Sequence, residues 1–331
     1  MTTTKTIIDK LNSVNLLGRG GAGFPAGKKW EITLSFSEKA DKTYIVCNGS
    51  EGELGVFKDG YILENYPEEL VNGVKVALET FPNSEAYIYL RKDYFKKFKK
   101  KLGKIIGSAP ITVFEEPGGY IAGEETALCN GIEGKRPEPR LKPPYPGEAG
   151  VFGKPTLINN LETFYYISKV SKDEYEDTRM YSISGAVKNE GVFELPNTIS
   201  IEDILKQTGN WPEKDFFVQM GGGACGDILL ADELKQGVCG AAALIIYDMG
   251  SHDPWQVMQT WVDFFQRGNC DKCTPCREGL QRLRVMIDNR KIEQEKFDAI
   301  MFALEQTSFC ALGRSAVTPF KSYVTKIYHE Q

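Results

Sequence analysis

The chain has 331 residues, of which 41% are hydrophobic and 26% charged, proportions typical of a globular protein with two or three domains. The net charge of −5 gives no reason to expect nucleic acid, and two histidines, His252 and His329, are too few for His-based zinc catalysis or a Ser-His-Asp hydrolase. We find neither a secretory leader nor an apolar run of the roughly 18 residues that span a bilayer. We therefore expect a cytoplasmic protein, at most peripheral to a membrane complex.

Strand-like and helix-like runs alternate as far as about residue 165. Residues 44–47 and 86–90 are short apolar runs bounded by turn residues, which is typical of buried strands. Residues 67–80 place apolar side chains, including Leu70 and Val74, on one helical face. This alternation predicts an α/β sheet.

A lysine-rich run follows the second predicted strand. It contains Lys96, Lys97, Lys99, Lys100, Lys101 and Lys104. Phe95, Phe98 and Leu102 recur at helical spacing, so the run predicts an amphipathic helix. Its basic face is either solvated or a docking surface for an acidic partner.

The remaining chain divides into two stretches. Between about 175 and 250, strand patterns at 181–187, 191–194, 216–218 and 241–247 surround a short helix beginning near Ser200. We expect a small α+β domain there. From about 255 onward, helical patterns at 255–266, 277–289 and 293–307 predict a helical bundle.

Four of the eight cysteines have the spacing of metal ligands. Cys270, Cys273 and Cys276 form C-x2-C-x2-C, and Cys310 follows far along the chain. A local triplet with a remote fourth thiolate suits a [4Fe–4S] cluster. Zinc and unligated thiols remain alternatives, although zinc sites with four cysteines usually pair two separated C-x2-C units.

Residues around the quartet also carry expectations. Pro275 is expected to prevent a helix from forming before the last local ligand. The other four cysteines lack ligand spacing, and we expect each to be a small buried hydrophobe. They are Cys47, Cys129, Cys225 and Cys239.

Three glycine-rich loops are candidates for a phosphate or flavin cradle. Residues 18–23 match G-x-G-x-x-G, and Arg19, Lys28 and Lys29 supply positive charge nearby. No clear strand precedes this loop, so structural turns are the alternative. Residues 48–53 and 118–127 combine glycines with acids, which either bind cofactor hydroxyls or cap helices.

Taken in order, the motifs of this chain resemble the NADH-oxidising, FMN-binding flavoprotein subunit of respiratory complex I and of related NAD-linked hydrogenases and formate dehydrogenases. The motifs that carry the resemblance are residues 18–25, 47–55, 123–128, 139–146, 158–163, 273–279 and 310–313. The chain departs from the family pattern at Ser50, Leu54, Ile32 and Asp271, where the family usually has Asp, Pro, an aromatic residue and Gly.

The resemblance implies a fold of three parts. It implies a Rossmann-like α/β flavin domain at 1–170, an α+β ubiquitin-like β-grasp domain at 171–252, and a helical iron–sulfur domain at 253–331. The implied cofactors are FMN, a [4Fe–4S] cluster ligated by the quartet, and NAD(H). The implied partners are a thioredoxin-fold [2Fe–2S] subunit and a larger iron–sulfur or catalytic subunit.

The resemblance also assigns roles to individual residues. FMN is expected among Gly20, Gly21, Gly23, Lys29, Asn48, Glu51, Gly123, Glu124, Glu125, Asn159 and Asn160. The nicotinamide nucleotide is expected near Phe24, Glu53, Tyr120, Lys142 and Tyr145, with Glu53 positioning its ribose and favouring NAD over NADP. Ala311 and Leu312 are expected to cover the flavin edge beside the cluster.

The expected function is hydride transfer between NAD(H) and FMN, followed by one-electron transfer to the cluster. No protein acid or base is assigned as catalytic. An electron relay between protein partners that binds FMN and the cluster but no nucleotide is the first alternative. A zinc-stabilised scaffold is the second.

Overall fold

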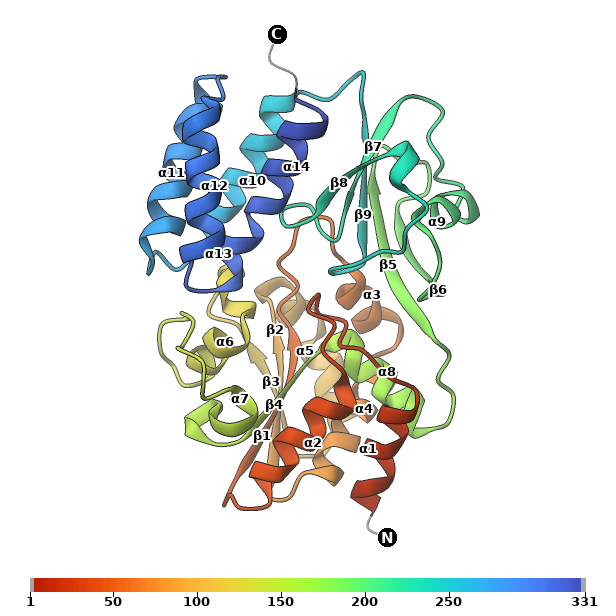
Figure 1. Cartoon of the computed structure of the whole chain (residues 1–331). Helices are drawn as coiled ribbons and strands as arrows, with labels where there is room; N and C mark the ends of the chain where they lie inside the picture. Colours follow the sequence, from red (N-terminus) through yellow and green to blue (C-terminus); the bar gives the residue numbers. More distant parts are fainter. Residues whose placement is uncertain (1–2, 329–331) are drawn as a thin grey trace. The chain divides into compact units, whose positions relative to one another are not determined.

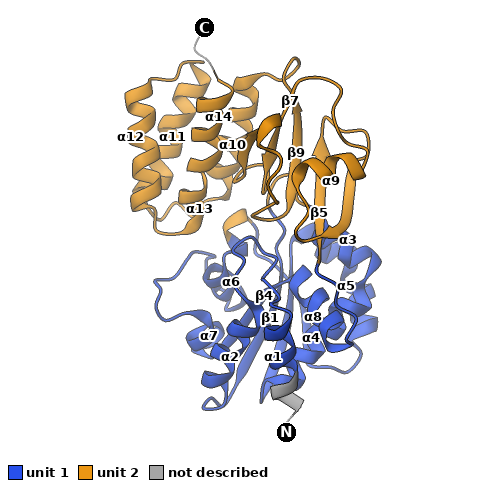
Figure 2. Ribbon diagram, turned by 45° about the vertical axis from the view of Figure 1, so that its right-hand side comes forward, with its two compact units in different colours: residues 1–52, 57–118, 122–177 blue, residues 53–56, 119–121, 178–331 orange. Residues whose placement is uncertain are grey.

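The computed structural model describes residues 3–328. The chain divides into two compact units, which Figure 2 colours separately. The first unit consists of residues 1–52, 57–118 and 122–177, and the second of residues 53–56, 119–121 and 178–331. Two short segments, 53–56 and 119–121, therefore belong to the second unit although the chain on both sides of each belongs to the first.

A parallel sheet of four strands, in the order β3-β2-β1-β4, runs through the first unit (Figure 1). The strands are β1 (Thr43–Gly49), β2 (Ser84–Leu90), β3 (Ile111–Glu115) and β4 (Thr156–Asn160). The predicted strands at 44–47 and 86–90 are β1 and β2. Both have neighbours on each side, and such strands in parallel sheets form near-continuous apolar runs.

Helices cover this sheet. They are α1 (Thr3–Ser13), α2 (Ala26–Ser37), α3 (Lys58–Asn65), α4 (Pro67–Thr80), α5 (Lys92–Ile106), α6 (Glu125–Ile132), α7 (Pro146–Ala149) and α8 (Leu161–Ser171). The predicted helix at 67–80 is confirmed as α4, with Pro67 in its first turn and Leu70 and Val74 buried. A Cβ on Gly73 would lie 1.9 Å from the Phe164 carbonyl oxygen, so α4 and α8 pack closely only because this residue is glycine.

The lysine-rich run forms α5, as its pattern predicts. Phe98, Leu102 and Ile106 are buried on one face. The lysines are exposed on the other face, where Lys97 forms an ion pair with Glu64.

The second unit contains a mixed sheet of five strands in the order β6-β5-β9-β7-β8. The strands are β5 (Thr178–Gly185), β6 (Gly191–Pro196), β7 (Phe216–Met220), β8 (Asp227–Leu230) and β9 (Ala243–Asp248). Strands β5 and β9 are parallel, and the other pairs are antiparallel. Helix α9 (Ile201–Gln207) is capped by Ser200, and its Ile204 joins the buried core of the sheet.

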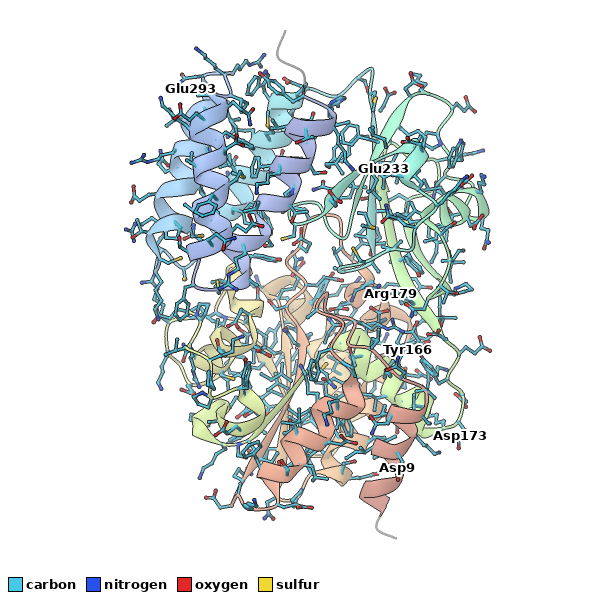
Figure 3. All side chains as sticks on the ribbon, viewed as in Figure 1. Asp9, Tyr166, Asp173, Arg179, Glu233 and Glu293 are labelled. Carbon is cyan, nitrogen blue, oxygen red and sulfur yellow. The ribbon has the colours of Figure 1, made fainter. Side chains whose placement is uncertain are left out.

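Five helices complete this unit. They are α10 (Pro254–Gly268), α11 (Thr274–Asp288), α12 (Gln294–Thr307), α13 (Ala311–Ser315) and α14 (Val317–Lys326). Glu233, labelled in Figure 3, forms an ion pair of 2.7 Å with Lys326 and connects the turn after β8 to α14. Among the described residues, no helix is both long enough and apolar enough to cross a membrane.

Candidate functional site

Two asparagines of the expected flavin site lie at the carboxyl ends of neighbouring parallel strands. Asn48 of β1 is in register with Asn160 of β4. Open α/β sheets bind ligands at this edge. Asn48 Nδ2 donates to the Gly123 carbonyl at 2.9 Å, and a Cβ on Gly20 would lie 3.2 Å from Asn160 Cβ. The fold thus brings together four expected flavin-site residues that are far apart in sequence.

Asn159 and Lys29 are held by the protein at the same sheet edge. In the amide orientation that satisfies both atoms, Asn159 accepts from Trp30 Nε1 at 3.0 Å and donates to the Ile158 carbonyl at 2.9 Å. Lys29 Nζ donates to the same carbonyl at 3.0 Å. Burial lowers the pKa of Lys29, while the carboxylate of Glu125 acts in the opposite direction.

The first glycine loop is a tight turn with open space beside Gly23. Gly18 N donates to the Phe24 carbonyl at 2.9 Å, closing the loop. Gly21 and Gly23 have φ of 106° and 65°, which side chains with a Cβ rarely adopt. Apart from Gly23 itself and its two chain neighbours, no heavy atom of the described residues lies within 4 Å of the position that a Cβ on Gly23 would occupy. The loop therefore leaves room for close approach of a ligand to its backbone.

Arg19 is buried in contact with α8. It is 2% exposed, its backbone N donates to Thr163 Oγ1 at 2.9 Å, and its guanidinium lies 5.2 Å from the ring centroid of Tyr166. Figure 3 labels Tyr166, which belongs to α8. Arg19 therefore anchors the glycine loop to α8, and Lys28 and Lys29 remain as the nearby cations that the sequence analysis named.

Glu51 caps a helix from a buried position. Its carboxylate accepts from Asp59 N at 2.8 Å, Gly60 N at 3.1 Å and Tyr94 Oη at 2.8 Å. Burial, followed by the charge of Asp59, raises the pKa of Glu51 to about 7. All three donors come from the protein, so Glu51 orders the start of α3.

A buried ion network that the sequence analysis missed lies beside Asn160. Lys58 is 2% exposed, and its Nζ lies 2.8 Å from Asp59 Oδ1 and 3.0 Å from Glu162 Oε2. Asn160 Nδ2 donates to Asp59 Oδ2 at 2.8 Å. Burial by itself would lower the pKa of Lys58, but the carboxylates of Asp59 and Glu162 outweigh it and raise that pKa. Lys58 Nζ also donates to Asn160 Oδ1 at 3.4 Å. The network therefore contains a charged lysine that holds the Asn160 side chain both directly and through Asp59.

The acids of the loop before α6 combine capping with ion pairing. The Glu124 carboxylate accepts from Thr126 N and Ala127 N, both at 2.9 Å, as an N-cap does. Lys142 Nζ lies 3.2 Å from Glu124 Oε1 and 2.9 Å from Glu125 Oε1. The capping alternative is therefore confirmed for Glu124, and the fold brings Lys142 to both acids.

The aromatic residues expected to stack on a nucleotide are exposed. Phe24 is 45% exposed and Tyr145 59% exposed. Tyr145 directly precedes α7, and Lys29 Nζ lies 6.0 Å from the ring centroid of Phe24. Ile32, where the family usually has an aromatic residue, is 41% exposed.

In the second unit, Glu53 and Tyr120 contact each other although they lie 67 positions apart in the sequence. Tyr120 Oη donates to Glu53 Oε2 at 2.8 Å. Burial is the main cause that raises the pKa of Tyr120 well above its usual value, so the hydroxyl stays a donor. The structure thus joins two of the five residues expected near the nucleotide.

The four cysteines of the quartet line one small cavity of the second unit. Leu312 and Gly313 also line it, whereas Ala311 is exposed at the start of α13. Among residues 3–328, no three His, Cys, Asp or Glu side chains are grouped as a single metal ion requires. Four thiolates around a common cavity are the donor set of a [4Fe–4S] cluster.

Local backbone geometry favours an anionic cluster at this position. Cys273 directly precedes α11, so the partial positive charge of the helix N-terminus lies beside the ligands. Burial, followed by the charges of Cys273 and Cys310, raises the pKa of Cys276 to about 12. Bound iron would offset the free-energy cost of deprotonating this thiol. The prediction for Pro275 was wrong: it lies in the first turn of α11, where its missing N–H is tolerated.

The expectation of four buried hydrophobic cysteines holds only in part. Cys47 and Cys129 are buried, whereas Cys225 is partly exposed and Cys239 is exposed. Cys225 also makes polar contacts, since its Sγ donates to Ser315 Oγ at 3.3 Å. Burial could not be predicted for these two because both lie in loops of the five-stranded sheet.

Asp271 occupies a left-handed backbone conformation with φ of 57°. Gly adopts this conformation freely and Asp or Asn with moderate strain, which explains why a glycine suits this position. Arg277 donates to the Asp271 carbonyl at 2.9 Å, fixing the turn between the first two cysteines of the quartet.

Replacing Asp271 by Asn is expected to raise the reduction potential of the cluster. The carboxylate adds negative charge beside an anionic group, which disfavours the reduced form. Asn tolerates the same φ, so the change isolates charge, and Asp271→Gly is the companion variant that also relieves strain. Redox titration followed by electron paramagnetic resonance measures the shift; potentials equal to that of the unmodified protein in both variants would contradict it.

Comparison with known proteins also separates a flavin-binding region from an iron–sulfur region along the chain. Residues 11–169 match a family model described as the Nuo51 FMN-binding domain, and residues 256–331 match the NADH-ubiquinone oxidoreductase-F iron-sulfur binding region. An NADH-quinone oxidoreductase subunit of Rhizobium meliloti (strain 1021) is 32% identical over 95% of this chain and 85% of its own length. The chain belongs to this family of NADH-quinone oxidoreductase subunits.

Other relatives extend the comparison. The corresponding NADH-quinone oxidoreductase subunit of Aquifex aeolicus (strain VF5) is 35% identical over 94% of this chain and 81% of its own length. NADP-reducing hydrogenase subunit HndC of Solidesulfovibrio fructosivorans is 29% identical over 99% of this chain and 76% of its own length. A crystal structure of NAD+-reducing [NiFe]-hydrogenase in the H2-reduced state matches with a TM-score of 0.87 and 26% identity, over 97% of this chain and 61% of that chain.

These comparisons confirm the resemblance on which the sequence analysis relied. The first unit carries the FMN-binding region of the family, and the cysteine quartet lies in its iron–sulfur region. The family is one of oxidoreductase subunits, so an iron–sulfur cluster and not zinc is the group assigned to this region. A mixed α/β fold with a parallel sheet is likewise confirmed.

Proposed function

We propose that this chain exchanges a hydride between NAD(H) and FMN and passes the electrons singly to a [4Fe–4S] cluster. The observation that carries the proposal is the presence, in one chain, of an FMN-binding region and of four cysteines around one cavity. FMN, when bound, supplies the conversion between two-electron and one-electron transfer. The protein residues bind, orient and shield the reactants.

We assign FMN to the carboxyl edge of the parallel sheet in the first unit. The residues proposed to hold it are Gly20, Gly21, Gly23, Lys29, Asn48, Glu51, Gly123, Glu124, Glu125, Asn159 and Asn160. The convergence of Gly20, Asn48, Gly123 and Asn160 supports the assignment. Lys29, with Lys28, would supply positive charge for a phosphate, and Glu51 would act by ordering α3.

We assign the nucleotide to Phe24, Glu53, Tyr120, Lys142 and Tyr145, with Ala311 and Leu312 covering the flavin edge. The rings of Phe24 and Tyr145 are exposed and suit stacking on adenine. The Glu53 carboxylate would accept bonds from ribose hydroxyls and repel a 2′-phosphate, which favours NAD over NADP.

The three-part fold is also part of this proposal. A Rossmann-like domain at 1–170, a β-grasp domain at 171–252 and a helical bundle at 253–331 are supported by the parallel sheet, the mixed sheet with α9, and helices α10–α14. The chain would work in a multisubunit complex with a thioredoxin-fold [2Fe–2S] subunit and a larger iron–sulfur or catalytic subunit. We propose a cytoplasmic location, peripheral to any membrane part of that complex.

The proposal is tested by mixing anaerobically purified holoprotein with NADH. The flavin absorbance is expected to bleach within one turnover. In Glu53→Gln, which keeps the shape but removes the charge, we expect nucleotide affinity to fall about tenfold or more, as for loss of a charge-assisted hydrogen bond. Lys97→Met, on the exposed face of α5, is the control that should bind nucleotide normally.

An alternative outcome would favour an electron relay without nucleotide. The relay is motivated by departures from the family pattern such as Ser50, where the family usually has Asp. The Ser50 hydroxyl donates to the Glu116 carboxylate. Holoprotein with full FMN and iron but no bleaching and no nucleotide binding would reject NAD(H) as substrate and select the relay. Zinc in place of iron would select the scaffold.

A further inference from the structure

A glycine-rich loop of the second unit, residues 221–226, holds the Glu53 side chain from its backbone. Ala224 N and Cys225 N donate to Glu53 Oε1 at 2.7 Å and 3.2 Å. Gly223 N donates to the Leu54 carbonyl at 2.7 Å. This loop lies far in sequence from every motif that suggested a cofactor, so its role could not be predicted from sequence.

Two glycines of this loop pack closely against the segment that contains Glu53. Gly222 has φ of 143°, and a Cβ there would lie 2.5 Å from Glu53 Cγ. A Cβ on Gly223 would lie 2.8 Å from Leu54 Cβ. Contacts this short do not occur with real side chains, so the loop lies this close to Glu53 because residue 222 is glycine and this close to Leu54 because residue 223 is glycine.

The Cys225 side chain continues the contacts toward the cluster cavity. Its Sγ lies 3.6 Å from Tyr120 Oη, the group that donates to Glu53 Oε2. The thiol donates to Ser315 Oγ at 3.3 Å, and Ser315 Oγ donates to the Leu312 carbonyl at 2.9 Å. Leu312 lines the cavity of the cysteine quartet.

The surroundings of these contacts keep the thiol protonated and the tyrosine in place. Burial, followed by the charge of Glu53, raises the pKa of Cys225, so the thiol remains a donor at neutral pH. The Tyr120 ring lies 4.6 Å from the ring of Phe264, and a Cβ on Gly268 would lie 2.8 Å from Tyr120 Cβ. Packing against α10 therefore leaves the Tyr120 hydroxyl little freedom to move.

We propose that Cys225 is a positioning residue that connects the Glu53 carboxylate to the loop lining the iron–sulfur cavity. Its backbone N–H and its contact with Tyr120 orient Glu53, and its thiol orients Ser315 and, through it, the Leu312 carbonyl. Nucleotide affinity and the environment of the cluster then depend on the same side chain. The nucleotide part rests on the proposed function of Glu53; the cluster part does not.

The test compares Cys225→Val, Cys225→Ser and the exposed-cysteine control Cys239→Val in full-length holoprotein. FMN and iron contents first establish that each variant is folded and loaded. Titration with NADH and NAD+, followed by flavin absorbance, gives nucleotide affinity. Electron paramagnetic resonance and redox titration of the cluster give the second readout, which needs no turnover.

We expect Cys225→Val, which removes the donor and puts a somewhat larger apolar side chain in its place, to weaken nucleotide binding about three- to tenfold, the usual effect of one lost hydrogen bond. It should also change the resonance spectrum and potential of the reduced cluster. Cys225→Ser, which restores a donor, should recover both, and Cys239→Val should match the unmodified protein. Ser315→Ala should reproduce the change in the cluster without altering residue 225.

The two proposals fail in different ways. If the unmodified protein binds no nucleotide, the proposed function fails, while a cluster spectrum altered by Cys225→Val and Ser315→Ala still supports the connection. If loaded Cys225→Val and Ser315→Ala both retain the cluster spectrum and potential of the unmodified protein, the connection is overturned. The same holds if Cys225→Ser behaves like Cys225→Val, because cavity shape and not the donor would then explain the change.

Discussion

Replacing Cys310 by alanine is expected to abolish assembly of the iron–sulfur cluster while leaving FMN bound. Cys310 is the one cysteine of the quartet outside the 270–276 segment, and it lines the cavity directly before the start of α13. Its loss leaves three thiolates and one open corner. Iron content should fall from about four atoms per chain toward zero, and the resonance signal of the reduced cluster should disappear.

The separation of the two cofactor regions makes this prediction specific. The FMN-binding region ends at residue 169 and the iron–sulfur region begins at residue 256, so flavin content should stay close to that of the unmodified protein. Cys239→Ala, at an exposed cysteine outside the quartet, is the matched control and should retain full iron. Full iron and an unchanged resonance signal in Cys310→Ala would show that Cys310 is not a ligand.

Replacing Lys58 by methionine is expected to destabilise the first unit by about 3–5 kcal/mol and to reduce FMN binding, because removing one partner of a buried ion pair leaves uncompensated charge. Asp59 and Glu162 would both lose their cation. Asn160 at the sheet edge would lose the donor Lys58 Nζ, which lies 3.4 Å from its Oδ1, and would be held less firmly. Thermal and urea denaturation measure stability, and flavin titration of the apoprotein measures affinity.

Two companion variants identify the cause of that loss. Lys97→Met removes an ion pair of α5 in which both side chains are largely exposed, and exposed pairs contribute little to stability. Lys58→Met combined with Glu162→Gln should regain part of the lost stability, because one uncompensated carboxylate is then neutral. Equal stability of Lys58→Met and Lys97→Met would refute a structural role for the buried network.

Local sequence patterns predicted several elements well. Strands β1 and β2, helix α4 and the lysine-rich α5 appear where apolar spacing placed them. Strands β3 and β4 were not predicted. Each has only five residues, and β4 ends in two asparagines whose side chains serve the sheet edge and not an apolar face.

For individual site residues, the structure shows contacts that the sequence did not predict. Glu51 and Glu124 remain proposed flavin-site residues, and the carboxylate of each also caps a helix. Arg19 was named as a nearby positive charge, but it is buried against Tyr166. A residue type at a given spacing does not specify which neighbour its side chain will contact, because that neighbour comes from a distant part of the chain.

By itself, the sequence determined the family, the two cofactor regions and the cysteine quartet. The spacing of three cysteines within a short segment directly limits where their thiolates can lie. The glycine loops could be recognised as motifs because their backbone conformation depends on residues that are neighbours in sequence. Only the tertiary structure revealed the Lys58 ion network, the backbone hydrogen bonds from residues 221–226 to Glu53, and the contact of Cys225 with Ser315. These groups are far apart in sequence, and only the packing of strands and helices brings their polar atoms within hydrogen-bonding distance.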